Sequence, residues 1–489
     1  MYNAMLHQVS GHKSAKLGSP SKRPNASRNL ESLLKSSLSR LTPIQRTLVL
    51  FAIFFQVILV LYLTRSHTPS LSFLNISSNT YGSLPKKSCD SRRIYVYDLP
   101  PMFNNDLLNG SNTNSNDGFG RPAKELAGII PASILPAWYW TDLSRGEVVY
   151  HNRMMNYRCR TLEPELATAF YIPFYAGIAL GKYLSGNYTA TDRGWHPEML
   201  NKWLQEQKCW NRSKGSDHFI MVGGVTWDFR RPREASSDAD WGSSLFNMPV
   251  MKNVIRLPIE RDAWDGLEVT VPYPTAFHPR SESDIIEWQG FVRSRRRNHL
   301  FAFVGNESEW RENDLRRILK GQCLNESTQC RYVNCGNDNC VESIDGRTRL
   351  MEAFLDSDFC LQPRGEGFMA RSIFDCMLAG SIPVLFWGRS AYFQYEFFLP
   401  LDSESYSVFI HRRDVRNGTD IRRVLEGLGS AKVERLREKV IEYLPRFVYG
   451  KQSQQFGKMR DAFDFAIDGV LSKYKAYMER GRAESRDKM

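Results

Sequence analysis

The sequence predicts an α/β protein of two domains, each built on a mainly parallel sheet, that follow a single membrane-spanning helix. Three observations support this fold class. Apolar strand-like runs alternate with helical segments over most of the 489 residues, a Gly-rich turn joins a strand to a helix late in the chain, and one apolar run near the N-terminus can cross a bilayer. Such alternation gives right-handed βαβ units, whose ligands bind at the carboxyl ends of the strands.

The membrane span is predicted from Thr47 to Thr64, 18 residues of which only Gln56 is strongly polar. Eight Lys and Arg precede it against the single acid Glu31, so the N-terminus should stay in the cytosol. A cleaved signal peptide is the alternative, but the preceding 46 residues are far longer than such peptides carry. We therefore expect a cytosolic tail (1–46), a retained anchor (47–64) and a luminal remainder.

The charge balance gives no indication of nucleic-acid binding. The tail contributes +7 of the formal net charge of +12, which leaves +5 for the remaining chain. The short basic run Arg293–Arg297 could attract an acidic polysaccharide, but a solvated linker is the simpler interpretation.

Sequons and cysteines both fit a luminal location. All nine cysteines lie beyond the anchor, and the cluster from Cys323 to Cys340 lacks the C-x-x-C pairs of common zinc sites, so disulfides are expected. The odd count leaves at least one thiol free or intermolecular, and we expect it to be Cys376. Seven glycosylation sequons also follow the anchor, at Asn75, Asn109, Asn187, Asn211, Asn306, Asn325 and Asn417.

The luminal part is long enough for two domains of ordinary size. A Ser-, Thr- and Asn-rich stem is expected over 65–89, a first domain over 90–285 and a second over 286–480, with a proline-rich boundary near 272–297. Strands are predicted at Arg93–Leu99, Ala169–Ala176, His218–Gly223 and His299–Gly305, and late helices at Lys432–Tyr443 and Phe456–Met478.

The segment from Phe359 to Trp387 predicts a strand, a turn with Gly365 and Gly367, a helix from Met369 to Leu378, and a second strand. Amides at the helix start and the guanidinium of Arg371 would favour a phosphate, and Asp375 could accept hydrogen bonds from a ribose. An ordinary strand-to-helix corner is the alternative, since such turns are common.

Seven segments, taken together and in order, resemble the exostosin-type glycosyltransferases of family 47, and within them the plant branch of the xyloglucan galactosyltransferases. They are RIYVYDLPPMFN (93–104), FYIPFYAG (170–177), TWDFRR (226–231), MKNVIRLPIER with VPYPTAFHP (251–279), FAFVGN (301–306), FCLQPRG (359–365) and RSIFDCMLAGSIPV (371–384). The resemblance implies a single-pass type II Golgi protein of the GT-B type, with two Rossmann-like domains facing across a cleft. Members transfer a sugar from a nucleoside diphosphate to a glycan hydroxyl with inversion.

Carried over by position, the resemblance places Arg364, Gly365, Arg371 and Ser372 in the donor site and Asp375 on the ribose. The interpretation from local chemistry assigns the same roles to Arg371 and Asp375. Where relatives typically carry an Arg before TWDFRR this chain has Gly224, and it has GEGFMA (365–370) where a Ser-containing turn is typical, so its donor could differ.

Inverting transfer also needs a base for the acceptor proton. The candidates are Asp228, His278 and Glu366. Asp228 could instead pair with Arg230 or Arg231, and His278 could satisfy backbone groups at a hinge.

No metal cofactor is expected. The D-x-D pattern at Asp238–Asp240 resembles a cation motif, but its setting favours a solvated loop, and Arg side chains with a helix dipole can replace the cation. Tryptophans could stack on sugar rings, with core packing as the alternative for most of them: Trp138, Trp140, Trp195, Trp203 and Trp210.

The expected function is transfer of a sugar, galactose in the first place, from a UDP-sugar to a xyloglucan side chain. The partners are then the donor, the polysaccharide, the membrane and other Golgi transferases. UDP-galacturonic acid or another UDP-sugar used on a different wall glycan is an alternative, as is a non-catalytic luminal partner of a transferase. A hydrolase is a minor option, because no acid and nucleophile pair stands out.

Overall fold

A computed structural model describes Gln56 and residues 89–108, 117–184, 187–233, 241–305, 315–338, 340, 343–365, 367–369, 371–451 and 458–486. The chain separates into a unit up to Ser83 and a unit from Leu84 onward, and the second unit contains both lobes described below. Within the described residues, no helix is both long and apolar enough to cross a bilayer. The predicted tail, anchor and stem lie outside them, apart from Gln56 and Cys89.

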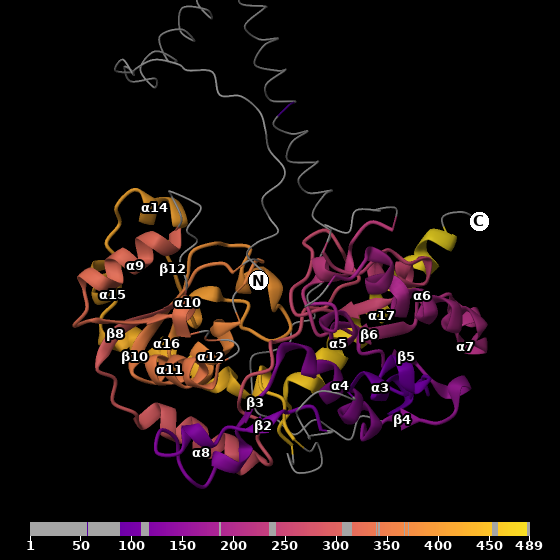
Figure 1. Cartoon of the computed structure of the whole chain (residues 1–489), viewed down its shortest axis with the longest axis horizontal. Coiled ribbons are helices and arrows are strands. Elements are labelled where there is room, and N and C mark those ends of the chain that lie inside the picture. Colours follow the sequence, from indigo (N-terminus) through magenta and orange to yellow (C-terminus); the bar gives the residue numbers. More distant parts are fainter. Residues whose placement is uncertain are drawn as a thin grey trace, which may run out of the picture. The chain divides into compact units, whose positions relative to one another are not determined.

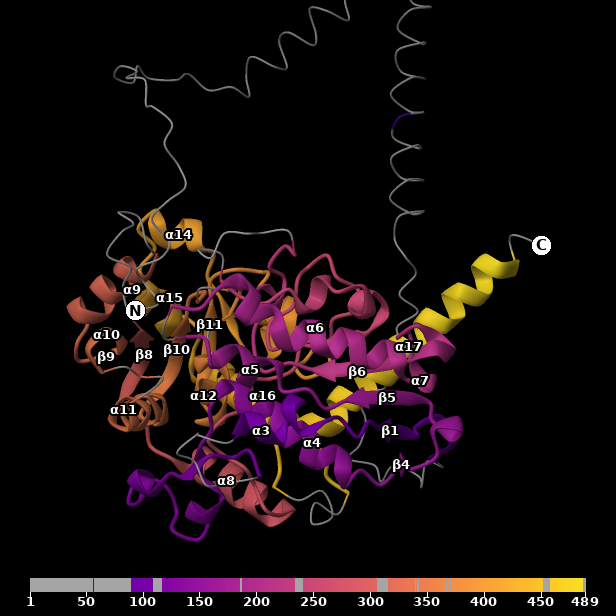
Figure 2. The ribbon, with the colours of Figure 1, turned by 45° about the vertical axis from the view of Figure 1, so that its right-hand side comes forward.

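The first lobe is built on a five-stranded parallel sheet with the order β4-β1-β5-β6-β7. Figure 2 shows β6, β5, β1 and β4 in this succession. Every residue of β5 and β6 is buried, as expected where both faces of a parallel sheet are covered. The three strands predicted here are confirmed, while β7 was not predicted. The bounds are β1 Ile94–Val96, β4 Arg160–Thr161, β5 Ala169–Ile172, β6 His218–Met221 and β7 Ile255–Leu257.

Helices cover this sheet, and a short antiparallel pair lies beside it. Helix α6 begins at a capping box, in which Thr189 accepts a hydrogen bond from the Asp192 N–H and Asp192 accepts one from the Thr189 N–H. The elements are α3 Asn105–Leu108, β2 Arg121–Pro122, β3 Tyr139–Trp140, α4 Gly146–Met155, α5 Ala176–Gly181, α6 Ala190–Glu206 and α7 Lys208–Ser213.

The second lobe carries another five-stranded parallel sheet, with the order β12-β11-β10-β8-β9. Helices α9 and α15 lie on one side of it and α11 and α12 on the other (Figure 1), where alternate strand residues enter two separate apolar clusters. The predicted α/β fold with parallel sheets in both halves is thus confirmed. The strands are β8 His299–Gly305, β9 Cys330–Asn334, β10 Ser357–Gln362, β11 Ile382–Leu385 and β12 Val408–Phe409. The helices are α8 Glu282–Ser294, α9 Leu315–Asn325, α10 Cys335–Asp338, α11 Ile344–Leu355, α12 Ser372–Leu378, α13 Ala391–Gln394, α14 Arg412–Arg416, α15 Ile421–Glu426 and α16 Ser430–Tyr443.

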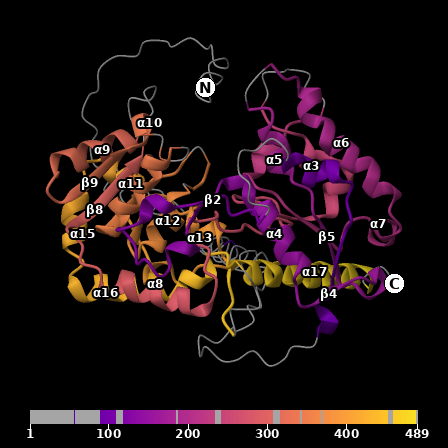
Figure 3. The same cartoon turned by 60° about the horizontal axis from the view of Figure 1, so that its bottom comes forward.

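The C-terminal helix α17 (Ala462–Arg486) returns to the first lobe. It contacts β7, and Figure 3 shows it in yellow alongside α4 and β5. A buried ion pair joins Asp461, just before the helix, to Arg153 of α4, and Arg92 lies 2.6 Å from Asp468. Helices α16 and α17 confirm the two predicted late helices, although α17 packs on the sheet of the preceding domain.

Disulfides join Cys89 to Cys159, Cys323 to Cys330, Cys335 to Cys340, and Cys360 to Cys376. The free cysteine is the half-buried Cys209, so the expectation of a free Cys376 is wrong. Helix α12 packs back against β10, the strand that precedes it, and this packing brings Cys376 to Cys360. The sequence does not show which helix face meets the strand.

Four sequon asparagines lie in the described part of the chain, and all four are exposed: Asn187, Asn211, Asn325 and Asn417. Asn75, Asn109 and Asn306 lie outside it.

Candidate functional site

The turn between β10 and α12, residues 363–371, is named the donor turn below. It follows β10 at the carboxyl edge of the second sheet, where ligands of parallel α/β proteins bind. The predicted order of strand, turn, helix and strand is confirmed, with the helix beginning at Ser372 rather than Met369. A hydrogen bond of 3.2 Å from the Gly365 N–H to the Met369 carbonyl closes the turn.

Asp375 lies on α12 just after the donor turn. Its side chain is 8% exposed, and burial raises the pKa of its carboxyl, while the nearby guanidiniums of Arg371 and Arg347 lower it. No described residue donates a hydrogen bond to this carboxylate. A buried acceptor without a donor is costly unless a ligand or water supplies one. The position therefore suits a ligand with hydroxyl groups.

Arg371 ties the donor turn to the first lobe. Its Nη2 donates to the carbonyl of Thr141 at 2.8 Å and to that of Pro274 at 3.3 Å. Desolvation lowers the pKa of Arg371, and the charge of Asp375 raises it. Arg347 on α11 makes a similar contact, since its Nη2 lies 2.8 Å from the Oδ1 of Asp142. Two guanidiniums therefore converge near Asp375.

The other predicted donor residues differ in their surroundings. Ser372 donates to the Gln362 side chain at 2.8 Å, which fixes the end of β10 to the start of α12. Arg364 is exposed, and its guanidinium lies 5.4 Å from the ring centroid of Trp387. Gly365 is half-buried. Their assigned roles toward a diphosphate stay predictions.

Glu260, for which no site role was predicted, fixes the donor turn from the first lobe. This carboxylate follows β7, is buried, and accepts hydrogen bonds from the Phe368 N–H at 2.7 Å, the Met369 N–H at 3.2 Å and the Tyr273 hydroxyl at 2.6 Å. Burial raises the pKa of Glu260, and these hydrogen bonds lower it. A Cβ atom at position 367 would collide with both Glu260 and Trp227, which accounts for Gly367 in the GEGFMA turn.

Among the predicted bases, His278 is fully buried. Its Nε2 lies 2.7 Å from the Thr141 hydroxyl and its Nδ1 lies 2.9 Å from the Tyr449 carbonyl. Burial lowers the pKa of His278 to about 4, so the ring is neutral near pH 7. With both nitrogens engaged, this geometry supports the interpretation that His278 satisfies polar groups between segments.

Asp228 lies on the short turn that follows β6, is half-buried, and accepts a hydrogen bond from the Trp241 indole at 3.1 Å. Arg230, two residues after Asp228, forms ion pairs with Asp265 and Glu268. Trp227, beside Asp228, touches Phe368 of the donor turn, with ring centroids 5.5 Å apart. Asp228 thus lies on a segment that reaches the donor turn, and Glu366 lies outside the described residues.

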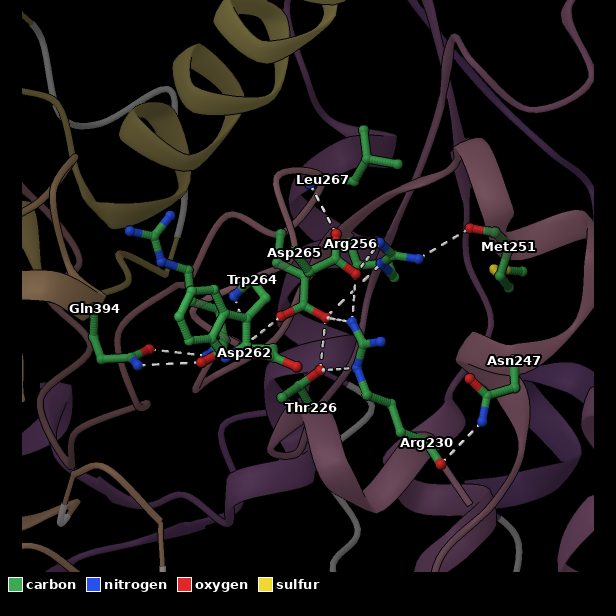
Figure 4. Close-up of polar contacts among 12 residues, drawn as sticks. Thr226, Arg230, Asn247, Met251, Arg256, Asp262, Trp264, Asp265, Leu267 and Gln394 are labelled. Atoms are coloured by element: carbon green, nitrogen blue, oxygen red, sulfur yellow. Dashed lines mark hydrogen bonds and ion pairs between the residues drawn. The ribbon is translucent and has the colours of Figure 1, made fainter. Parts of the chain in front are cut away.

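The loop from Pro258 to Glu268 makes hydrogen bonds to residues of both lobes (Figure 4). Glu268 accepts hydrogen bonds from the Thr226 hydroxyl at 2.6 Å and the Asp262 N–H at 2.7 Å. The Gln394 side chain of α13 accepts from the Arg261 N–H at 2.9 Å and donates to the Arg261 carbonyl at 3.2 Å. The loop is therefore fixed to both lobes.

In the described part of the chain, no group of three or more His, Cys, Asp or Glu side chains could hold a metal. Asp238–Asp240 lies outside that part, so the metal-free expectation stays a prediction.

A buried aspartate beside two guanidiniums, after a Gly-rich turn at the carboxyl edge of a parallel sheet, is the kind of site in which α/β proteins hold a nucleotide. The model of the Exostosin GT47 domain matches residues 88–425, and the chain belongs to this glycosyltransferase family.

Relatives from Arabidopsis thaliana are similar over most of the chain. Xyloglucan galactosyltransferase XLT2 is 51% identical over 79% of this chain and 76% of its own length. Xyloglucan galactosyltransferase MUR3 is 36% identical over 81% of this chain and 65% of its own length. Xyloglucan-specific galacturonosyltransferase 1 is 36% identical over 79% of this chain and 58% of its own length. Among solved structures, a mutant of TarM from S. aureus aligns with a TM-score of 0.28 at 8% identity, over 57% of this chain and 58% of that chain.

Proposed function

We propose that this chain is a Golgi galactosyltransferase that moves galactose from UDP-galactose to a xyloglucan side chain. Membership of the Exostosin GT47 family and the 51% identity to xyloglucan galactosyltransferase XLT2 support this proposal. The structural observation that carries it is Asp375, a buried carboxylate beside Arg371 and Arg347 that receives no hydrogen bond from the described residues.

In this proposal the two parallel-sheet lobes form a GT-B enzyme with the acceptor on the first lobe and the donor on the second. Asp375 accepts hydrogen bonds from the ribose hydroxyls. Arg371, Arg347 and Arg364 surround the diphosphate and stabilise its charge as it leaves. Because Arg371 also donates to Thr141 and Pro274, its position is set by the first lobe.

The transfer is a single displacement. An acceptor hydroxyl oxygen forms the new bond to the anomeric carbon, its proton passes to a base, and the bond from that carbon to the diphosphate oxygen breaks to release UDP. Asp228 is the base that the geometry favours over His278, because Asp228 is half-buried beside Trp227, whereas both His278 nitrogens are engaged.

The membrane topology is part of the proposal. Residues 47–64 anchor the chain, and residues from 65 onward lie in the Golgi lumen, where disulfides form and sequons receive glycans. Resistance of the full-length protein to alkaline extraction, together with a mass decrease on glycosidase treatment, would support this topology. Release into the soluble fraction without glycans would contradict it.

The test is a donor screen with the full-length chain. UDP-galactose, UDP-galacturonic acid and other UDP-sugars are offered with xyloglucan oligosaccharides, and UDP binding is measured separately by calorimetry. Wild type should transfer galactose. Asp375→Ala should lose UDP binding and transfer but keep its melting temperature, and Asp106→Ala, an exposed acid on α3, should behave as wild type.

Two results would redirect the assignment. Transfer from UDP-galacturonic acid alone would change the donor, as the name of one 36% identical relative suggests. Absence of both UDP binding and transfer would overturn the enzyme proposal in favour of a non-catalytic partner.

A further inference from the structure

The tryptophans considered from the sequence as sugar-stacking residues are mostly core residues, since Trp138, Trp140 and Trp210 are buried. Two others, Trp227 and Trp264, are exposed by 38% and 82%. Both follow strands of the first sheet at its carboxyl edge, Trp227 after β6 and Trp264 after β7. These strands are neighbours and parallel, and a bridge between Val225 and Glu260 continues their pairing.

Each of these indoles contacts a segment at the carboxyl edge of the second sheet. Trp227 meets Phe368 of the donor turn edge to face, with centroids 5.5 Å apart. Phe368 in turn stacks on Trp387 at 5.3 Å. The ring of Trp264 lies 5.8 Å from the Arg389 guanidinium, two residues beyond Trp387. Because β10 and β11 are adjacent and parallel, the donor turn and the segment 387–389 lie at the same edge.

The backbone that carries Trp264 is fixed although its side chain is exposed. The Trp264 N–H donates to the Asp262 side chain at 3.1 Å, and the Asp262 N–H donates to the buried Glu268 at 2.7 Å. Trp264 and Asp262 lie on this loop (Figure 4), and the Arg261 N–H of the same loop donates to Gln394 of the second lobe. A rigid support lowers the entropy cost of using an exposed aromatic ring for binding.

We propose that Trp227 and Trp264 form a subsite for the acceptor glycan, in which their indole faces stack on pyranose rings of a glucan backbone. This inference rests on the proposed glycosyltransferase function. An acceptor hydroxyl must reach the donor, and from the first lobe Trp227 contacts the donor turn while Trp264 contacts Arg389 in the neighbouring segment. A pyranose face of C–H groups suits an aromatic face, and Arg389 can donate hydrogen bonds to the sugar hydroxyls.

The charge around Trp264 favours a neutral glycan over a lipid surface or a protein core. An apolar docking surface would be depleted of charged groups, whereas here Arg389 lies over the ring and Asp262 caps the loop. Polar groups beside an aromatic ring suit a ligand that has an apolar face and a rim of hydroxyls.

The test compares variants of the full-length chain in calorimetric binding to xyloglucan oligosaccharides without donor, and separately to UDP. Trp264→Ala should weaken oligosaccharide binding at least tenfold while UDP binding stays within twofold. Trp264→Phe should retain most of the oligosaccharide affinity. Trp227→Ala should weaken both ligands, because its ring also contacts the donor turn. The matched control is Trp195→Ala, a 47% exposed tryptophan on α6, which should bind as wild type.

The KM for the acceptor should rise in Trp264→Ala while the KM for the UDP-sugar stays constant. Native oligosaccharide affinity in both Trp264→Ala and Trp227→Ala would overturn the subsite. Failure of wild type to bind UDP would instead overturn the proposed enzyme, since oligosaccharide binding is measured without the nucleotide. Preserved oligosaccharide binding in Trp264→Ala together with lost binding to anionic vesicles would identify the indole as a membrane contact and reject the glycan subsite.

Discussion

The Glu260 carboxylate accepts a hydrogen bond of 2.7 Å from the backbone N–H of Phe368, 108 residues further along the chain. Glu260 follows strand β7 of the first lobe, whereas Phe368 belongs to the donor turn of the second lobe. The conformation of the turn is thus set by both lobes. The buried carboxylate, rather than a residue of the turn itself, satisfies the N–H groups of Phe368 and Met369.

Replacement of Glu260 should therefore weaken donor binding. In Glu260→Ala, two backbone N–H groups and the Tyr273 hydroxyl lose their acceptor, at a cost of about 1–3 kcal/mol for each buried group left unpaired. We expect the dissociation constant for UDP, measured by calorimetry, to rise at least tenfold. Glu260→Gln keeps one acceptor oxygen, so its dissociation constant for UDP should lie between those of wild type and Glu260→Ala.

The control for this prediction is Glu198→Gln, which changes an exposed glutamate paired with Arg233 on the surface. Exposed pairs contribute little, so its UDP affinity should equal that of wild type. Native UDP affinity in Glu260→Ala would show that the donor turn holds its conformation without the carboxylate.

The disulfide between Cys360 and Cys376 should also support the donor turn. It joins β10 to α12 across a sequence separation of 16 that contains the whole turn. A cross-link of this length stabilises a fold by about 3 kcal/mol in the chain-entropy account. The double variant Cys360→Ala with Cys376→Ala should melt at a lower temperature and bind UDP more weakly. The free Cys209 supplies the control, since Cys209→Ser should change neither quantity. An unchanged melting curve for the double variant would refute the prediction.

Local patterns were sufficient to predict parts of this structure. Strands β5 and β6 were predicted because buried parallel strands form continuous apolar runs, and Arg371 and Asp375 were placed at the donor turn because the strand, glycines and helix that position them are consecutive. Strand β7 was missed because it is short and contains Arg256. That arginine can be buried because its guanidinium lies 2.6 Å from Asp265, nine residues later, and donates to the Met251 carbonyl at 3.0 Å.

The parts that could not be predicted depend on contacts between distant segments. No local signal distinguishes Glu260 from any other acid after a strand, because its partners Phe368 and Met369 lie in the other lobe. The same reason applies to Cys376, whose pairing depends on how α12 packs on β10. His278 is a third case. From the sequence, a histidine near a domain boundary can act as a catalytic base or can satisfy buried polar groups, and only the partners of its two ring nitrogens distinguish these roles.

Gly367 should be intolerant of any side chain. A Cβ atom there would collide with the Trp227 ring and with the Glu260 carboxylate, which the Tyr273 hydroxyl holds in place. We expect Gly367→Ala to lose most sugar transfer and UDP binding while the melting temperature falls only slightly. Gly290→Ala is the matched control, because nothing lies within 4 Å of a Cβ atom at that position, which is on α8 away from the donor turn. Wild-type transfer by Gly367→Ala would mean that the turn can shift away from Glu260 without loss of function.

The buried His278 should make the protein less stable in mild acid. Burial lowers its pKa from 6.5 to about 4, although the Tyr449 carbonyl and Asp117 act in the opposite direction and Lys451 and Arg371 reinforce the lowering. Between these two pH values the unfolded chain binds a proton that the folded chain does not, so stability falls as the pH decreases through this window. His151 and His196, whose pKa burial also lowers to about 4, add to the effect. Burial raises the pKa of Glu147 to about 8 and that of Asp464 to about 6, and these carboxyls act in the opposite direction, so the contribution of His278 is measured as the difference between wild type and variant in the fall of melting temperature from pH 7 to pH 5. The variant His278→Gln should melt lower at pH 7 and should lose less of its stability on acidification than wild type does, because the buried imidazole no longer has to remain neutral. Equal slopes in wild type and His278→Gln would show that His278 takes up its proton in the folded state.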